Sequence, residues 1–266
     1  MSSPTVPLTR RGFLETGRKD RWWVQPVVTA VILGSFAVYA TWAAFQGRNY
    51  HHGPYLSPFY SPELFGESPH ALFGARPSWW PGWLRFSPAL LIMPFPLLFR
   101  VTCYYYRGSY YKAFWADPPA CSVGEPRKTY LGERSFPLIL QNVHRYAMYI
   151  AVAFIVILSY DAWKALWWPT EEGGTRFGLG LGALLLATNA VCLAGYTLGC
   201  HSLRHIIGGW RDQFSRRPLF RQPYRCVTCL NDKHHRWAWV SLFTVALSDL
   251  YIRLCASGVL TDPRIF

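Results

Sequence analysis

Five apolar stretches, each of about twenty residues or more, constrain this chain more than any other feature of its sequence. A bilayer core of about 30 Å is crossed by a helix of about 20 apolar residues. The chain is 51% hydrophobic, and its hydrophobic residues are gathered into these stretches instead of being spread at amphipathic spacing. The stretches cover residues 23–46, 86–106, 138–163, 178–207 and 237–257. We therefore predict an all-α membrane protein, a single domain over residues 1–266 that forms a bundle of five transmembrane helices.

The second stretch, 86–106, is the weakest of the five. It contains Pro88, Pro94 and Pro96, and proline removes a backbone hydrogen bond and kinks a helix. Neighbouring helices must satisfy the carbonyl groups that are freed in this way. We expect a kinked span here.

The distribution of basic residues predicts the orientation of the bundle. The N-terminal tail and the loops 107–137 and 208–236 together carry 17 Lys and Arg, whereas loops 47–85 and 164–177 and the C-terminal tail carry 6. Because basic loops stay in the cytoplasm, the N-terminus should be cytoplasmic and the C-terminus outside. The net charge of +13 then reflects this bias and attraction to anionic lipid, and no nucleic-acid partner is expected. Loop 47–85 should lie on the outer surface, with its aromatic side chains at the interface.

Histidine and cysteine side chains gather in the cytoplasmic half of the predicted bundle. Ionisable residues in spans are costly and usually mark a functional site. His201 and His205 are four residues apart and share one helix face. The alternative is that each histidine only hydrogen-bonds a neighbouring helix, but their number favours a redox or metal centre. Its candidate ligands are His144, His201, His205, Cys200 and Cys121.

Two smaller patterns stand apart from this group. Cys226 and Cys229 form a CxxC motif before His234 and His235. Two interpretations of this motif are possible, a small zinc knuckle or two free thiols. A disulfide is not expected on the reducing cytoplasmic face. Asp249 and Arg253, four residues apart in the fifth stretch, are predicted to form an ion pair.

Several segments resemble a known family. "RVTCYYYRGSYYKAFWADPPACSVGEP", "FPLILQNVHRYAMY", "CHSLRHIIGG" and "SDLYIRL" are similar to the membrane-anchor subunit of succinate dehydrogenase (complex II) of the actinobacterial, haem-free, single-anchor type. The resemblance covers about residues 97–257. It implies a multi-pass plasma-membrane anchor that docks a flavoprotein and an iron–sulfur subunit on the cytoplasmic face and passes electrons to a quinone, menaquinone or ubiquinone. The chain has no flavin or dicarboxylate site of its own, so "enzyme" applies to the complex.

The resemblance also implies a cofactor. In the haem-free type this is a Rieske-type [2Fe–2S] cluster with two His and two Cys ligands, a ligation that raises the reduction potential above that of an all-Cys cluster. The preferred imidazoles are His144 and one of His201 or His205. The preferred thiolates are Cys200 and Cys121, with Cys103 and then Cys226 and Cys229 in reserve.

Haem b is not expected. Haem-bearing anchors place a ligand His seven residues before an Arg-His pair, and here Leu198 precedes Arg204-His205 at that spacing. A di-haem cytochrome b anchor of another quinone-linked oxidoreductase and a non-enzymatic scaffold or transporter remain as alternatives. For the quinone headgroup we predict Arg204, His234 and Trp237, because the headgroup needs hydrogen-bond donors and apolar walls. The segment "YYYRGSYYKAFW" is predicted to dock the iron–sulfur subunit.

Overall fold

The computed structural model describes residues 11–128, 134–136, 138–170, 173–209, 213 and 218–265. The chain divides into two compact units. Unit 1 comprises Met1–Ala37 and Val101–Asn142, and unit 2 comprises Val38–Arg100 and Val143–Phe266. Each unit is described by itself below.

Four segments within the described part of the chain are long and apolar enough to cross a membrane. They are α1 (Val24–Gln46), Leu138–Lys164, α6 (Leu181–Leu198) and α9 (His234–Ala256). The second of these joins the 3-10 helix η3 (Leu138–Val143) to α5 (His144–Lys164). These segments correspond to the first, third, fourth and fifth predicted spans.

The second predicted span is not one helix. Residues 86–106 fall in α2 (Ala89–Ile92), α3 (Pro94–Thr102) and the first turn of α4 (Tyr104–Tyr110). Prolines at the start of α3 cannot supply the N–H groups that would continue α2. Cys103, between α3 and α4, is extended, with φ −64° and ψ 128°. The prediction of five continuous helices is therefore not confirmed.

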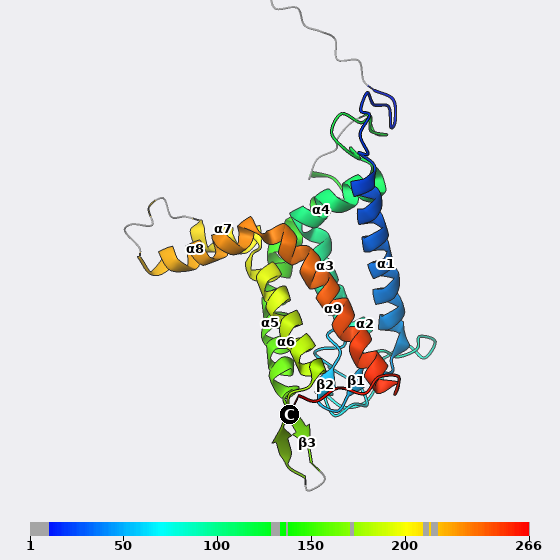
Figure 1. Ribbon diagram of the computed structural model, residues 1–266, viewed down its shortest axis with the longest axis vertical. Coiled ribbons are helices and arrows are strands. Elements are labelled where there is room, and N and C mark those ends of the chain that lie inside the picture. The colour runs from blue at the N-terminus through cyan, green and yellow to red at the C-terminus, as the bar shows by residue number, and fades with distance from the viewer. Residues whose placement is uncertain are drawn as a thin grey trace, which may run out of the picture. The chain divides into compact units, whose positions relative to one another are not determined.

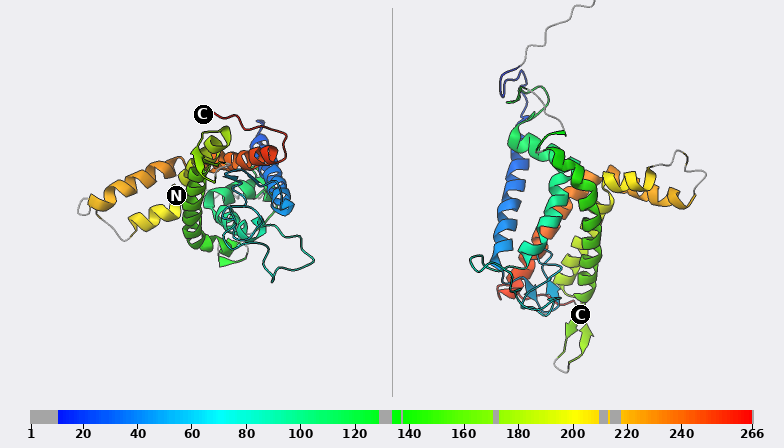
Figure 2. Two further views of the ribbon diagram at one scale, coloured as in Figure 1. Left: turned by 90° about the horizontal axis from the view of Figure 1, so that it is seen from below. Right: turned by 180° about the vertical axis from the view of Figure 1, so that it is seen from behind.

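The fourth predicted span also breaks, near its end. α6 ends at Leu198, Cys200 is extended with ψ 139°, and α7 (His201–Gly208) begins in a new direction. The region expected to be loop 208–236 contains a further helix, α8 (Pro218–Asp232). In Figure 1 and the right-hand view of Figure 2, α7 and α8 run side by side, across the direction of α5, α6 and α9. This α7–α8 hairpin belongs to unit 2.

In unit 2, α6 packs against both α5 and α9. Its buried face carries small residues that allow close approach, as is usual between helices in membranes. A Cβ added at Gly182 would lie 2.4 Å from the Tyr55 ring, so that ring occupies the space a side chain would take. Polar contacts join α6 to α9: Thr244 Oγ1 donates to Asn189 Oδ1 at 3.3 Å.

Two small antiparallel sheets accompany the helices. β1 (His51–His52) pairs with β2 (Tyr55–Leu56), and β3 (Trp167–Pro169) pairs with β4 (Thr175–Phe177). The first sheet lies in loop 47–85, where Tyr55 and Tyr60 are fully buried. That loop is consequently a packed part of unit 2.

The predicted Asp249–Arg253 ion pair is confirmed. Arg253 Nε donates to Asp249 Oδ2 at 2.7 Å, with both side chains buried. Tyr39 donates to the same oxygen at 2.6 Å, and Ser57 donates to Oδ1. The remaining guanidinium nitrogens of Arg253 donate to the carbonyls of Ala43 and Arg48.

Unit 1 contains the segment "YYYRGSYYKAFW". It forms α4 and a π-helical turn, η1 (Tyr111–Trp115). Arg107 is buried, and its guanidinium carbon lies 4.2 Å from the centroid of the Tyr104 ring. Gln141 Nε2 donates to Tyr110 Oη at 2.9 Å. The segment is therefore an ordered aromatic surface built around a buried arginine.

Candidate functional site

Seven side chains gather at one end of the unit 2 bundle, near the end of α3, the start of α5, the end of α6 and the start of α9. We call them the polar–aromatic cluster. Its members are Phe99, Arg100, His144, Tyr196, Cys200, His234 and Trp237.

The first part of the cluster is an imidazole–thiol pair. His144 Nε2 lies 3.1 Å from Cys200 Sγ. His144 is the first residue of α5, and its ring stacks on Phe99 with centroids 4.8 Å apart and an interplanar angle of 7°. Cys200 is buried, and its sulfur accepts a hydrogen bond from the Ser202 N–H at the start of α7. The helix break at Cys200 is thus what brings the thiol to His144.

The second part is built around the ring of Tyr196, which is buried. His234 stacks on this ring with centroids 5.0 Å apart, and the guanidinium carbon of Arg100 lies 4.8 Å from its centroid. Arg100 Nη2 donates to Ser241 Oγ at 3.0 Å, and Nη1 donates to the Ala238 carbonyl at 3.4 Å. A guanidinium in a bundle of apolar helices is costly and marks a functional site.

Trp237 completes the cluster. A Cβ added at Gly195 would lie 2.6 Å from the Trp237 ring, so the indole packs directly on the backbone of α6. Its Nε1 atom is buried and has no hydrogen-bond partner among the residues that the structure describes. Leaving such a donor unsatisfied costs about 1–3 kcal/mol, and an exception of this kind in a native fold calls for an explanation such as a ligand.

Of the five predicted metal ligands, the structure brings His144 and Cys200 together. His201 and His205 are exposed on α7, with ring centroids 6.5 Å apart. His205 Nδ1 lies 3.5 Å from Arg145 Nη2. Cys121 is exposed in unit 1. Over the described ranges, no three His, Cys, Asp or Glu side chains form a group that could hold a metal ion.

The CxxC motif does not belong to such a group either. Cys226 and Cys229 are both exposed on α8. His234, which the zinc-knuckle hypothesis places beside them, instead stacks on Tyr196.

Of the three predicted quinone residues, two lie in the cluster. His234 and Trp237 are one turn apart on α9. Arg204 instead contacts α8, because its Nε donates to Thr228 Oγ1 at 3.3 Å and its guanidinium carbon lies 5.5 Å from the centroid of the Tyr224 ring. These contacts join α7 to α8.

Sequence reasoning missed Arg100 and Tyr196. A signal for Arg100 was present, because it is a charged residue inside the apolar stretch 86–106. Tyr196 lies between Gly195 and Gly199, but this spacing does not reveal that its ring contacts His234 and Arg100.

These features define a multi-pass membrane protein that buries a group of polar side chains at one end of its helix bundle. The chain belongs to the family of the actinobacterial succinate dehydrogenase subunit SdhC, whose family model matches residues 24–258. It is also similar to a chain of the solved structure "Mycobacterium smegmatis Sdh1 complex in the apo form". That chain is 42% identical, with 98% of this chain and 97% of the other covered and a TM-score of 0.87. No curated protein matches. The protein is a subunit of a succinate dehydrogenase complex and is not catalytic alone.

Proposed function

We propose that this subunit anchors a flavoprotein and an iron–sulfur subunit to the plasma membrane and delivers their electrons to a quinone bound at the polar–aromatic cluster. The family supports the first part of the proposal. The observation that carries the second part is the buried Trp237 Nε1, which has no hydrogen-bond partner in the described part of the chain. Trp237 lies one turn from His234, which stacks with Tyr196 beside Arg100.

The chemistry of a quinone fits this group of side chains. Reduction of a quinone to the quinol takes two electrons and two protons, and both carbonyl oxygens become hydroxyls. Succinate oxidation in the flavoprotein supplies the electrons. Arg100 and Trp237 are the hydrogen-bond donors for a carbonyl oxygen, and His234 can hold and release a proton. Phe99 and Tyr196 supply aromatic walls for the ring.

The position of Arg100 is fixed by two hydrogen bonds, from Nη2 to Ser241 Oγ and from Nη1 to the Ala238 carbonyl. Both contacts come from α9, the helix that also carries His234 and Trp237. Arg100, on α3, is therefore linked by hydrogen bonds to the helix that carries the two other residues.

The [2Fe–2S] cluster fits less well. A Rieske-type centre needs two imidazoles and two thiolates, whereas within the described residues His144 lies beside Cys200 and no three candidate ligands form a group. The described residues therefore do not form a four-ligand set, and the proposed function does not depend on a cluster. The cluster stays a prediction. If the reduced complex has a Rieske-like paramagnetic signal that His144→Ala and Cys200→Ser both abolish, the prediction holds, and its absence from the intact complex would remove it.

The topology is proposed on the charge distribution. The alternation of 17 against 6 basic residues supports five crossings with the N-terminus in the cytoplasm and the C-terminus outside, in which α2 and α3 would form a broken second span. A reporter fused after Phe266 that is active in the cytoplasm would contradict this.

The segment "YYYRGSYYKAFW" is the proposed docking surface, and charge reversal at exposed positions such as Lys112 should weaken attachment of the soluble subunits.

The quinone site is tested with two activities of the purified complex. Succinate oxidation by an artificial dye that accepts electrons from the soluble subunits does not need the anchor, whereas succinate:quinone activity does. Trp237→Phe keeps the ring and removes the N–H. We expect the KM for quinone to rise about fivefold to tenfold, as loss of one hydrogen bond of about 1–1.5 kcal/mol implies, with dye activity unchanged. Arg100→Lys should also raise this KM, because lysine lacks the planar fork.

Arg145→Leu is the matched control. Arg145 is an exposed arginine at the start of α5 and is not part of the polar–aromatic cluster, so its removal should leave both activities at the parental level. If Trp237→Phe and Arg100→Lys leave the quinone KM unchanged, the cluster is not the quinone site. If both activities fall together, the variants have disturbed assembly, and the site assignment fails.

A further inference from the structure

The α7–α8 hairpin leaves the helix bundle sideways, and nothing in the proposed electron transfer uses it. In Figures 1 and 2 it extends away from α5, α6 and α9 at the end of unit 2 where the polar–aromatic cluster lies. Asn231 Nδ2 donates to the Gly199 carbonyl at 2.9 Å and so fixes the C-terminal end of α8 to the break after α6. Since α6 and α9 are long and apolar enough to cross a membrane, a hairpin that runs across their direction at one end is oriented to lie along the membrane surface.

The side chains of α8 are sorted into three faces at about 100° per residue. The first face packs on α7. It contains Val227, which is buried, together with Thr228 and Tyr224, whose ring occupies the space beside Gly208. The two other faces are free of α7 and differ in character.

The second face is apolar. Leu219, Pro223, Cys226 and Leu230 lie within about 60° of one another on the helix. Leu219 is 86% exposed, and Pro223 and Cys226 are also exposed. A leucine that is so exposed on a helix with clear amphipathic character suits a helix that lies in the membrane interface.

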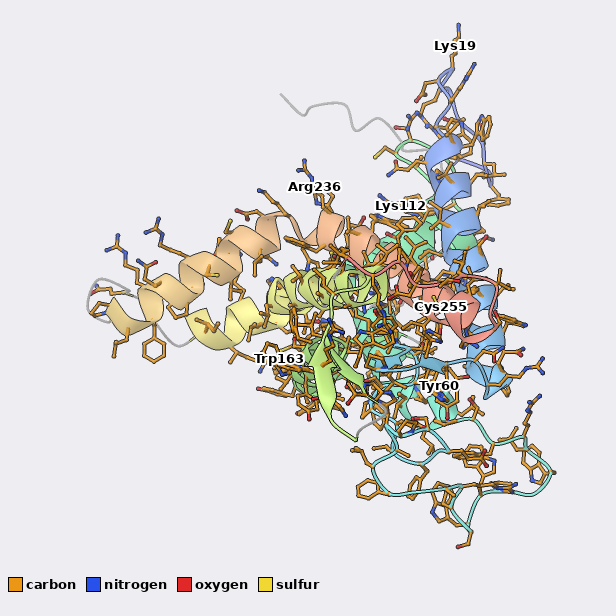
Figure 3. All side chains as sticks on the ribbon, turned by 60° about the horizontal axis from the view of Figure 1, so that its bottom comes forward. Lys19, Tyr60, Lys112, Trp163, Arg236 and Cys255 are labelled. Atoms are coloured by element: carbon orange, nitrogen blue, oxygen red, sulfur yellow. The ribbon has the colours of Figure 1, made fainter. Side chains whose placement is uncertain are left out.

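The third face is basic. Arg221 and Arg225 are exposed and lie about 150° from the apolar face. Lys233 and Arg236 are exposed just beyond α8, and Figure 3 shows Arg236 near the junction of α8 and α9. Residues 208–236 carry seven Lys and Arg but only two acidic residues, Asp212 and Asp232. Basic residues near an anionic leaflet are attracted to it and strengthen binding to the membrane.

We propose that the α7–α8 hairpin is an interfacial anchor that lies on an anionic phospholipid surface. Its apolar face dips to the level where headgroups meet acyl chains, and its arginines reach lipid phosphates. Charge complementarity selects this occupant, because the exposed arginines of α8 match anionic phosphates. The apolar face of α8 exposes an aliphatic side chain, a proline and a thiol, whereas Phe220, which is 37% exposed, lies about 100° from Leu219 on the helix. The proposal does not depend on the quinone site.

The first experiment measures depth in the bilayer. The full complex, in a Cys121→Ser, Cys229→Ser background, is spin-labelled at Cys226 and placed in nanodiscs that contain phosphatidylglycerol. Power saturation should show Cys226 more accessible to oxygen, which partitions into lipid, than to a soluble nickel chelate. A label introduced by Arg221→Cys with Cys226→Ser should show the reverse order. Cys226→Ser alone in the same background measures labelling of the buried cysteines.

Two outcomes would overturn the proposal. If Cys226 is open to the nickel chelate, the hairpin faces water. If both positions are shielded from both reagents, a protein subunit covers the hairpin instead of lipid.

The second experiment tests the charge. Arg221→Gln with Arg225→Gln should reduce, several-fold, the phosphatidylglycerol that co-purifies with the complex relative to phosphatidylethanolamine. Arg76→Gln with Arg264→Gln removes two exposed cations outside the hairpin and should not change this ratio. Equal ratios in both pairs would contradict the proposal. The quinone KM should stay at the parental value in the hairpin variants, so failure here is distinct from failure of the quinone site.

Discussion

The two ends of α9 bury polar groups in opposite ways. Near its C-terminal end, the Asp249 carboxylate accepts hydrogen bonds from Arg253, Tyr39 and Ser57, and the buried charge has an opposite charge beside it. Near its N-terminal end, His234 stacks on Tyr196, and Trp237 Nε1 has no hydrogen-bond partner within the described residues. At the C-terminal end the protein itself supplies the partners of the buried carboxylate. At the N-terminal end the buried indole N–H has no such partner among the described residues.

The difference separates a structural role from a functional one. A buried polar network with all members satisfied makes a core rigid and specific, whereas a partly satisfied one is costly. That cost persists in a native protein when a ligand supplies the missing partner. By this argument, variants at the Asp249 end should change stability more than activity, and variants at the Trp237 end should change quinone kinetics more than stability.

The largest expected effect is at the satisfied end. Arg253→Ala leaves the Asp249 carboxylate buried without its cation, which costs about 3–5 kcal/mol of stability. We expect the anchor to unfold at a much lower temperature, or the complex to dissociate during purification. Fluorescence-detected size exclusion after heating measures this directly.

Replacing both partners sharpens the test. Asp249→Leu with Arg253→Met removes both charges, and such replacements are often neutral or stabilising, so much of the lost stability should return. Arg264→Ala, at an exposed cation, is the control. If Arg253→Ala is no worse than Arg264→Ala, the network is not what stabilises this end.

A smaller effect is expected where α6 meets Trp237. Gly195→Ala would place a Cβ 2.6 Å from the indole ring, so the ring must shift away from α6. Overpacking of this kind costs about 1–3 kcal/mol, and the shift should also raise the quinone KM. Gly34→Ala on α1, where no atom lies within 4 Å of the added carbon, should change neither. Equal behaviour of the two variants would show that Trp237 is free to move.

The apolar runs predicted most of the fold because hydrophobic length is a direct requirement of the bilayer. Four of the five stretches are long apolar helical segments. The prediction of one helix over 86–106 was not confirmed, because periodicity and hydropathy do not show whether a helix with several prolines stays continuous. The region 208–236 was expected to be a loop because its charge was counted, whereas the amphipathic spacing of Leu219, Val227 and Leu230 was not.

The site was predictable only where the chemistry is local. His144 and Cys200 were identified because ionisable side chains in spans usually mark a site, and His234 and Trp237 because a quinone headgroup needs hydrogen-bond donors and apolar walls. Their partners were not, since the stacking of His234 on Tyr196 and of His144 on Phe99 joins helices whose rotation the sequence does not fix. Asp249 and Arg253 were paired correctly because both lie on one helix, four residues apart.

The smallest expected effect is a decrease in the stability of the packed loop 47–85 at low pH. This loop lies outside α9. Burial lowers the pKa of His70. Its Nε2–H donates to the Gly53 carbonyl at 3.3 Å. This hydrogen bond and the nearby Asp161 and Glu63 oppose the shift, whereas Lys164 adds to it. Because the folded pKa is below the ordinary value of about 6.5, the unfolded loop binds the proton more readily. The stability that neutral His70 gives to the folded loop is therefore fully present above the ordinary pKa of about 6.5. It is lost as the pH falls through the pKa of the folded state.

The backbone amides of this loop should therefore be less protected from hydrogen exchange at pH 5.5 than at pH 7.5, after correction for the pH dependence of intrinsic exchange. His70→Gln retains an N–H donor and does not titrate, so it should remove most of this extra opening. His52→Gln, in the same loop, should keep it. The effect is small because one partly exposed histidine is involved and solvent screens its charge. If His70→Gln and the parent open equally at pH 5.5, the loop's stability does not depend on this proton, and its packing rests on Tyr55 and Tyr60 instead.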